Sequence, residues 1–139
     1  MTDKLKIDTQ GLLSNISDVD ARFKNPLVLA YIGDTVYDLY IRGTLVKSSS
    51  EGINELHKKA CSMVNARSQA RAADKLFPLF TEEETDIFKR GRNAKSGIPK
   101  NMSPADYHAA TGLEAVIGYL YLTGRQDRIE EFFGVILNG

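Results

Sequence analysis

Two prolines, each directly after a helix-capping residue, constrain the fold of this chain more than any other feature. Pro26 follows Asn25, and Pro104 follows Ser103. Proline is tolerated at the first position of a helix because its missing N–H would have no partner there, and Asn and Ser are favoured N-caps. A long apolar segment follows each pair. The sequence therefore predicts one helix from residue 26 to about residue 42 or 46, and another from residue 104 to residue 122, stopped by Gly124.

The rest of the chain also carries helix signals, and strand signals are nearly absent. Thr81 and Glu84 form a capping box for a helix that should end near Gly91. Apolar residues at helical spacing predict one helix over residues 51–77 and a last helix over residues 125–137, with a weaker one around residues 12–16. Residues 93–102 are expected to form a loop. We predict an all-α protein with a single domain over residues 1–139, a length that suits one compact core.

Composition and charge narrow the functional classes. Eighteen Lys plus Arg balance eighteen Asp plus Glu, so any polyanion partner must be bound by local clusters of bases. Cys61 is the only cysteine, which suits a reducing cytoplasm, and it is expected in the core. The N-terminus has no apolar signal core, so a cytoplasmic location is expected. Residues 27–46 are the only membrane candidate and contain Asp34, Asp38 and Arg42, each costing roughly 2.5–3.5 kcal/mol at mid-bilayer. No membrane association is expected.

Two acids stand alone within the two apolar helices. Asp34 lies in the first and Glu114 in the second, each beside small residues such as Gly33 and Gly118. Small side chains let helices approach closely, so the two acids are placed to converge. Two carboxylates together repel unless a proton or cation lies between them, and a site made only of oxygen ligands fits Mg²⁺ or Mn²⁺. Such an ion suits phosphodiester hydrolysis.

A purely structural interpretation is open as well. A buried acid in a helical protein can pair with a base or a tyrosine hydroxyl. Asp38 stands four residues before Arg42, the spacing of an ion pair on one helix face. The pattern alone does not choose between a metal site and structural pairing.

Four motifs in series resemble a known family. The segment YIGDTVYDLYIR (residues 31–42) resembles the signature helix of ribonuclease III, and LEAVIGYLYL (residues 113–122) resembles the second catalytic helix of that fold. The segments LHKKACSMVNARSQA (residues 56–70) and FKRGRNAKS (residues 88–96) extend the match to the bacterial Mini-ribonuclease III subfamily. The resemblance runs from about residue 25 to residue 122.

The resemblance implies a ribonuclease III-like endonuclease domain that forms a homodimer and cuts double-stranded RNA with Mg²⁺, for which Mn²⁺ can substitute. It implies products with 5′-phosphate and 3′-hydroxyl ends. It suggests as substrate the precursor of large-subunit (23S) ribosomal RNA, and as a further partner the ribosomal assembly intermediate that contains this RNA. Asp34 and Glu114 match the metal-binding, catalytic acids of the family.

The chain also departs from the larger members of the family. Two further glutamates of their signature helix are Ala30 and Leu27 here, and an aspartate of their second helix is Thr111. Asp38 and Thr111 are candidates for an outer shell around the metal, although Asp38 is favoured as the partner of Arg42. The number of ions, one or two, stays open. We expect no double-stranded-RNA-binding domain, so the catalytic domain itself must hold RNA.

Two clusters of bases are candidates for RNA binding. Residues 89–100 contain five bases and no acid, and the segment over residues 51–77 adds more. Bases of this kind contact phosphates with little sequence reading, which matches how A-form duplexes are recognised. For the second cluster, a merely solvated helix face is an equal alternative. The predicted RNA-binding residues are Arg90, Arg92, Asn93, Lys95, Lys100, Lys58, Lys59 and Arg67.

A homodimer also has a physical motive in the first helix. Val28, Tyr31, Tyr37 and Tyr40 exceed what one helical layer needs to bury, so part of this helix is expected in a dimer interface. A twofold dimer would place one site on each strand of a duplex. The alternative function is a noncatalytic helical RNA-binding protein that assists ribosome assembly. A small helical protein-interaction domain would leave the basic loop unexplained.

Overall fold

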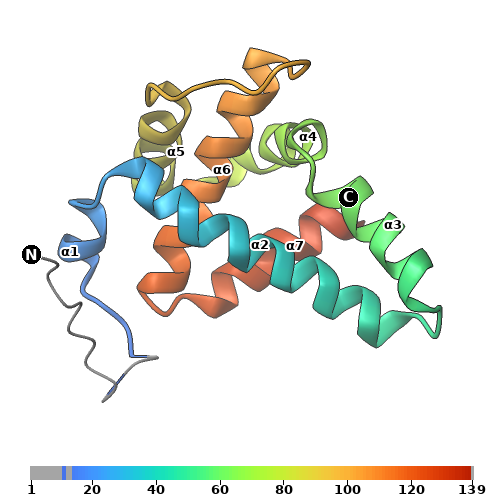
Figure 1. Cartoon of the computed structure of the whole chain (residues 1–139). Helices are drawn as coiled ribbons and strands as arrows, with labels where there is room; N and C mark the ends of the chain where they lie inside the picture. The colour runs from blue at the N-terminus through green and yellow to red at the C-terminus, as the bar shows by residue number, and fades with distance from the viewer. Residues whose placement is uncertain (1–10, 12–13, 139) are drawn as a thin grey trace, which may run out of the picture.

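A computed structural model describes residue 11 and residues 14–138 of the chain (Figure 1). This part contains seven α-helices, one short 3-10 helix and no strand, so the predicted all-α class is confirmed. The elements in chain order are α1 (Asp18–Arg22), α2 (Pro26–Ser48), α3 (Ile53–Val64), α4 (Ala66–Leu76), η1 (Phe77–Leu79), α5 (Glu82–Asn93), α6 (Pro104–Leu122) and α7 (Gln126–Asn138).

The predicted starts of the main helices are confirmed. The Asn25 side chain accepts a hydrogen bond from the backbone N–H of Leu27 at 2.8 Å, and Ser103 accepts one from that of Asp106 at 3.3 Å. Both arms of the capping box between Thr81 and Glu84 are formed. Each side chain thus satisfies a backbone donor that the first turn leaves without a helical partner.

One predicted helix is two. Where apolar spacing predicted a single helix over residues 51–77, the chain breaks at Asn65, which has extended backbone angles (φ −71°, ψ 163°). The Asn65 side chain donates to the carbonyls of Cys61 and Ser62, both at 3.1 Å, and accepts from the N–H of Ser68 at 2.9 Å. It therefore closes α3 and opens α4. The apolar period continued across this bend, which is why the pattern missed it.

The N-terminal helix also differs from the expectation. Residues 12 and 13 of the expected segment lie outside the described residues, and residues 14–16 are not helical. The helix is instead α1, capped by Ser17.

The helix expected to end near Gly91 is α5, and it continues two residues past this glycine. Gly91 is buried against α6, where a Cβ would lie 3.0 Å from the Cα of Gly112, so it serves close packing rather than helix termination.

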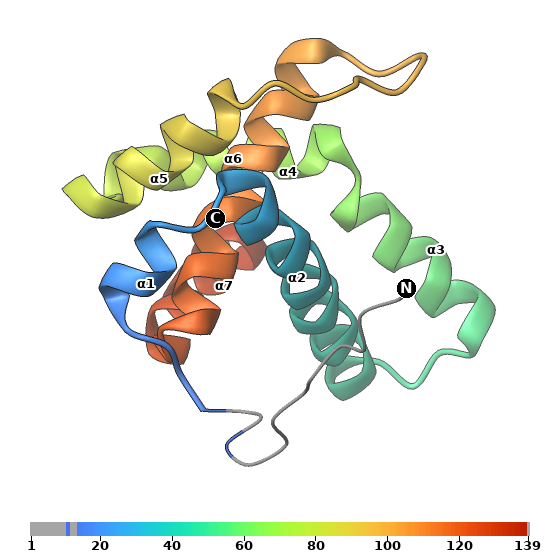
Figure 2. The same ribbon diagram turned by 60° about the vertical axis from the view of Figure 1, so that its left-hand side comes forward.

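Helix α6 forms the centre of the core. It packs against α2, α5 and α4, and Figures 1 and 2 show these three helices around it. Nearly every residue from Ala110 to Leu120 is buried, which requires apolar side chains on all faces of the helix. The aromatic rings of α5, α7 and η1 complete the core. Phe80 lies 5.6 Å from both Phe88 and Phe132, measured between ring centroids.

Helix α2 differs from α6 in having two apolar sides, one buried and one exposed. Val28, Tyr31, Leu39 and Val46 recur along the exposed side, and Tyr31 is 82% exposed. Of the four residues that suggested an excess of apolar surface on this helix, two pack inward: Tyr37 is fully buried, and the ring of Tyr40 stacks on Phe133 at 5.1 Å. Tyr37 belongs to the core, and Tyr40 packs against it.

The predicted burial of one further residue, Cys61, was wrong. Cys61, expected in the core, is exposed on α3, with its Sγ 3.5 Å from Nε2 of His57. Leu56 and Ala60 of α3 line a hollow shared with α2, and Cys61 lies outside this hollow.

None of the helices in the described part of the chain combines the length and apolar character needed to cross a bilayer.

Candidate functional site

The candidate site lies where α2 and α6 come closest. A Cβ on Gly33 would lie 1.7 Å from the carbonyl oxygen of Glu114, and a Cβ on Gly118 would lie 2.0 Å from the carbonyl oxygen of Leu29. Each glycine thus admits the backbone of the opposite helix. Because the residue after Gly33 is Asp34, this close approach brings the α2 acid to the α6 acid.

The side chains of Asp34 and Glu114 meet, as the sequence analysis expected. The two carboxyl groups lie close enough for Asp34 to raise the pKa of Glu114 through hydrogen bonding and through its charge. Their surroundings differ from the expectation, however. Asp34 is exposed rather than buried among apolar side chains, and Glu114 is mostly buried. The apolar neighbours of Asp34 in the sequence lie on other sides of α2, so the acid itself reaches solvent. The pair therefore has one carboxyl open to a ligand from outside.

The electrostatics of the pair follow from this arrangement. Burial first, and then the hydrogen bond and the charge of Asp34, raise the pKa of Glu114 to about 9, and a hydrogen bond from Gln69 limits the rise. The pKa of the nearby Tyr37 hydroxyl is raised as well, by burial and by the charge of Glu114. Without a cation, Glu114 therefore keeps its proton near neutral pH, because a second, buried negative charge beside Asp34 is unfavourable.

A hard divalent cation can take the place of that proton. Mg²⁺ usually binds one or two protein carboxylates and completes its octahedron with water or substrate oxygens. The Asp34–Glu114 pair supplies this minimum. Within residues 14–138, no cluster of three or more His, Cys, Asp or Glu side chains could hold a metal. The donors present therefore fit Mg²⁺ or Mn²⁺ and exclude a site enclosed by protein ligands alone.

Sequence reasoning missed one residue of the site, Gln69. Its side chain comes from α4, is 3% exposed, and donates from Nε2 to Oε2 of Glu114 at 3.4 Å. The signal was present in the subfamily motif over residues 56–70, which ends in Ser-Gln-Ala. A single amide in that motif did not indicate which acid it would face.

The two proposed outer-shell residues make other contacts. Asp38 accepts a hydrogen bond from Nε of Arg42 at 2.9 Å, so the ion pair that was favoured for it is formed. The buried hydroxyl of Thr111 donates to the carbonyl of Tyr107 at 3.0 Å, one turn earlier in α6.

The basic segment over the last turn of α5 and the loop that follows it contains both residues with structural contacts and exposed residues. Arg90 donates to the carbonyls of Arg22 and Lys24 at 2.9 and 3.1 Å, which ties α5 to the end of α1. The guanidinium of Arg92 lies 5.7 Å from the ring centroid of Phe88, and its Nε donates to Oδ1 of Asn93 at 3.4 Å. Lys95 and Lys100 are exposed on the loop.

The bases of α3 and α4 are exposed too. Lys58 pairs with Glu55 at 3.6 Å, and Lys59 pairs with Glu51. Arg67 is exposed near the start of α4. Ion pairs of this exposure contribute little to stability, so Lys58 and Lys59 can exchange their partners for phosphate. Their role in RNA binding stays a prediction.

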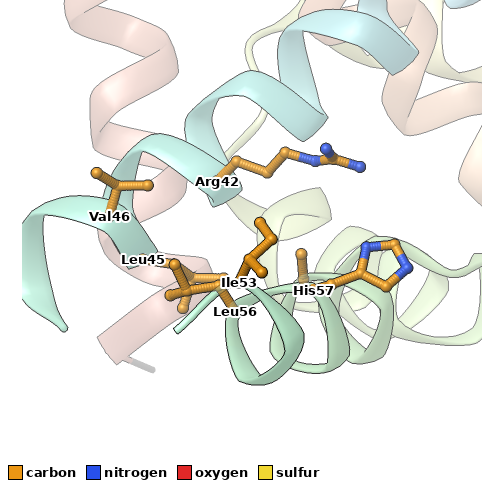
Figure 3. Close-up of a pocket in the computed structure, with 7 residues that line it drawn as sticks. Arg42, Leu45, Val46, Ile53, Leu56 and His57 are labelled. Carbon is orange, nitrogen blue, oxygen red and sulfur yellow. The ribbon is translucent and has the colours of Figure 1, made fainter. Parts of the chain in front are cut away.

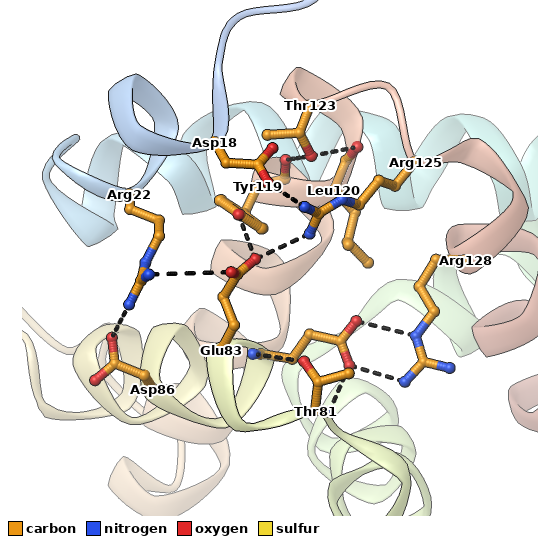
Figure 4. A network of polar contacts seen from close by, with 11 residues as sticks. Asp18, Arg22, Thr81, Glu83, Asp86, Tyr119, Leu120, Thr123, Arg125 and Arg128 are labelled. Atoms are coloured by element: carbon orange, nitrogen blue, oxygen red, sulfur yellow. Dashed lines mark hydrogen bonds and ion pairs between the residues drawn. The ribbon is translucent and has the colours of Figure 1, made fainter.

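A second group of charged residues, separate from the Asp34–Glu114 pair, forms ion pairs between the helices (Figure 4). Arg125 donates to Glu83 at 2.9 Å and also pairs with Asp18, so it joins α1, α5 and the start of α7. Arg128 donates through Nε and Nη2 to the buried carboxylate of Glu84 at 2.9 and 2.8 Å. Every carboxylate of this group is matched by an arginine or a hydroxyl, which is typical of structural pairing.

An apolar hollow of about 100 Å³ lies between the end of α2 and α3 (Figure 3). Its lining includes Leu45, Val46, Ile53 and Leu56, with Arg42 and His57 at the rim. No carboxylate lines it. The hollow therefore offers mainly apolar contact, with Arg42 and His57 as its polar side chains and no carboxylate to hold a metal ion.

Comparison with known proteins gives a consistent picture. The ribonuclease III domain family matches residues 27–125. Mini-ribonuclease 3 of Symbiobacterium thermophilum is 46% identical over 107 residues, covering 76% of this chain and 82% of that protein. Mini-ribonuclease 3 of Staphylococcus aureus is 41% identical over 128 residues, covering 90% of this chain and 96% of that protein.

A solved structure extends the match to the fold. The crystal structure of a protein from Fusobacterium nucleatum superposes with a TM-score of 0.81 at 30% identity, covering 89% of this chain and all of that one. The family match contains both carboxylates and the glycines that bring them together. The chain belongs to the ribonuclease III family, in its Mini-ribonuclease III branch.

Proposed function

We propose that this ribonuclease III-type endoribonuclease cleaves double-stranded or structured precursor RNA with Mg²⁺ held by Asp34 and Glu114. The observation that carries the proposal is the meeting of these two carboxyls, one exposed and one mostly buried. Mn²⁺ would substitute for Mg²⁺, since both ions accept oxygen ligands. We further propose precursor 23S ribosomal RNA as substrate, by analogy with the family, and the cytoplasm as the compartment.

In this proposal, the two acids bind the metal ion and nearby bases bind the RNA phosphates. Glu114, anchored in α6, supplies a fixed ligand, and Asp34 supplies the ligand nearest the solvent, where a phosphate can approach. Bound Mg²⁺ would polarise the scissile phosphate and activate water, leaving a 5′-phosphate and a 3′-hydroxyl. Lys95, Lys100 and Arg92 would hold phosphates of the duplex without reading its sequence.

The experiment that tests this function compares Asp34→Asn and Glu114→Gln with the wild type on duplex RNA. Each change removes a charge and almost no volume. We expect cleavage to fall at least about 100-fold, with unchanged helical content by circular dichroism and an unchanged Kd for duplex RNA in EDTA. A variant that still cuts at the wild-type rate in saturating Mg²⁺ would contradict the assignment of that acid.

We also propose a homodimer that contacts through the exposed side of α2. Val28, Tyr31, Leu39 and Val46 form an apolar row on one side of this helix, and a monomer in water has no use for it. Tyr31→Glu should convert dimer to monomer in analytical ultracentrifugation. A wild-type protein that is monomeric at micromolar concentration would exclude this interface.

The alternative is a noncatalytic RNA-binding assembly factor with the same fold. It shares the basic loop and the core but has no use for a pair of carboxyls at contact. Incubation of the protein with duplex RNA, with and without Mg²⁺, separates the two: the enzyme yields new 5′-phosphate ends only with the metal, and the binding protein yields none.

A further inference from the structure

We propose that Gln69 is a positioning residue that holds the Glu114 carboxylate in the orientation that binds the divalent ion. The inference rests on the proposed function of the Asp34–Glu114 pair. Gln69 does not contact the scissile phosphate in this proposal. It acts only through the oxygen of Glu114 that its amide contacts, Oε2, at 3.4 Å from Nε2.

The bend at Asn65 brings Gln69 to this position. The side chain of Asn65 ends α3, and its carbonyl accepts the backbone N–H of Gln69 at 3.0 Å in the first turn of α4. From there α4 packs on α6. Gln69 lies on this helix, and its side chain reaches the carboxyl of Glu114 in the middle of α6.

The burial of Gln69 indicates a dedicated contact. At 3% exposure it is one of three buried polar or charged side chains among the described residues. A buried amide costs roughly 1–3 kcal/mol when it is left without a partner, so an apolar residue would serve packing better at this place. The partner of its donor is the carboxyl of Glu114, and the amide adds no charge to a site that already holds two acids.

The consequence for the site is an oriented ligand. Glu114 has three freely rotating side-chain bonds, and Asp34 contacts it from the exposed side. A donor on one of its two oxygens fixes the rotation of the carboxylate and directs the remaining lone pairs toward Asp34. Partners that orient metal ligands in this way typically change metal affinity 10- to 100-fold when they are removed.

The test compares the wild type with Gln69→Leu, which keeps the volume and removes the donor, and with Ser68→Ala as the matched control. Ser68 is the neighbouring residue on α4, and its hydroxyl donates to the carbonyl of Ser62 at 2.7 Å rather than to the acids. Mn²⁺ binding without RNA, followed by the electron paramagnetic resonance of the free ion, gives a readout independent of cleavage. Helical content and the Kd for duplex RNA in EDTA report on folding and on RNA binding.

We expect Gln69→Leu to bind Mn²⁺ about 10- to 100-fold more weakly than the wild type. It should need a correspondingly higher Mn²⁺ concentration for half-maximal cleavage. At saturating Mn²⁺, the maximal cleavage rate should be largely recovered. Ser68→Ala should bind Mn²⁺ like the wild type, and the Kd for RNA should not change in either variant. If Gln69→Leu does not fold, Gln69→Asn replaces it, since its amide is one methylene too short to reach Glu114.

Two results would overturn the proposal, and they are distinguishable. A folded Gln69 variant that binds Mn²⁺ within twofold of the wild type excludes the positioning role and leaves the proposed function intact. A wild-type protein that binds no Mn²⁺ and cuts no duplex RNA overturns the metal site itself, and the role of Gln69 with it.

Discussion

Replacement of Gly33 by alanine tests the contact on which the site depends. The new Cβ would lie 1.7 Å from the carbonyl oxygen of Glu114, 2.7 Å from its carbonyl carbon and 2.9 Å from the backbone nitrogen of Gly118. All three are backbone atoms of α6, so no flexible side chain can move aside. The two helices must separate by about 1.3 Å merely to bring the shortest contact to 3.0 Å.

The magnitude follows from two opposing effects. Alanine in place of glycine inside a helix gains about 1 kcal/mol, because the unfolded chain loses backbone freedom. Overpacking costs roughly 1–3 kcal/mol in ordinary cores and more where backbones collide. We expect a net loss of about 2 kcal/mol or more for Gly33→Ala. Gly43 provides the matched control on the same helix, since nothing lies within 4 Å of a Cβ built there. Gly43→Ala should gain about 0.5–1 kcal/mol.

Urea unfolding followed by circular dichroism measures both variants against the wild type. The expected result is a lower midpoint for Gly33→Ala and a higher one for Gly43→Ala. Folded Gly33→Ala should also bind Mn²⁺ more weakly, because separating α2 from α6 separates Asp34 from Glu114. Equal stabilities of the two variants within about 0.5 kcal/mol would refute the argument that helix contact at Gly33 builds the site.

Three further predictions concern charged groups. The folded pKa of Glu114 is about 9, above its ordinary 4.5, so this group stabilises the metal-free fold fully below pH 4.5 and loses that contribution as the pH rises toward 9. In EDTA at pH 8, urea unfolding should therefore show Glu114→Gln more stable than the wild type by roughly 2–4 kcal/mol. This difference in stability should vanish near pH 4. Arg128→Met should cost roughly 3–5 kcal/mol in the same assay, because the Glu84 carboxylate that it leaves unpaired is 3% exposed, whereas Arg42→Met at an exposed pair should cost less than about 1 kcal/mol. Arg92→Ala should weaken duplex RNA binding in EDTA and lower the slope of log K against log salt by about 1, and an unchanged slope would remove Arg92 from the RNA-binding surface.

Local signals in the sequence predicted much of the fold. The caps at Asn25, Ser103 and Thr81 act within one turn of the chain, so their hydrogen bonds are available to any context that allows a helix. The ion pair of Asp38 with Arg42 is local in the same sense. The bend at Asn65 was missed because the apolar spacing continues across it. Only the structure shows that the Asn65 side chain hydrogen-bonds to the end of α3 and to the start of α4.

Burial was harder to predict than helix position. The sequence presented Asp34 and Cys61 as residues of apolar segments, and both are exposed. Tyr37 and Tyr40 were counted among the residues that exceed what one helical layer buries, yet Tyr37 is fully buried and Tyr40 stacks on Phe133. Helix α2 carries apolar residues on two sides, and periodicity within a single helix does not tell which of them faces α6.

The sequence by itself determined the starts of the main helices, the family and the two acids that stand out from apolar surroundings, because each depends on residues adjacent along the chain. Only the tertiary structure decided that Gly33 and Gly118 admit the opposing backbones, that the two carboxyls meet at the edge of the core, and that Gln69 contacts one of them. These contacts join residues 45 to 89 positions apart. Their geometry depends on how closely three helices pack, which no local pattern of residues specifies.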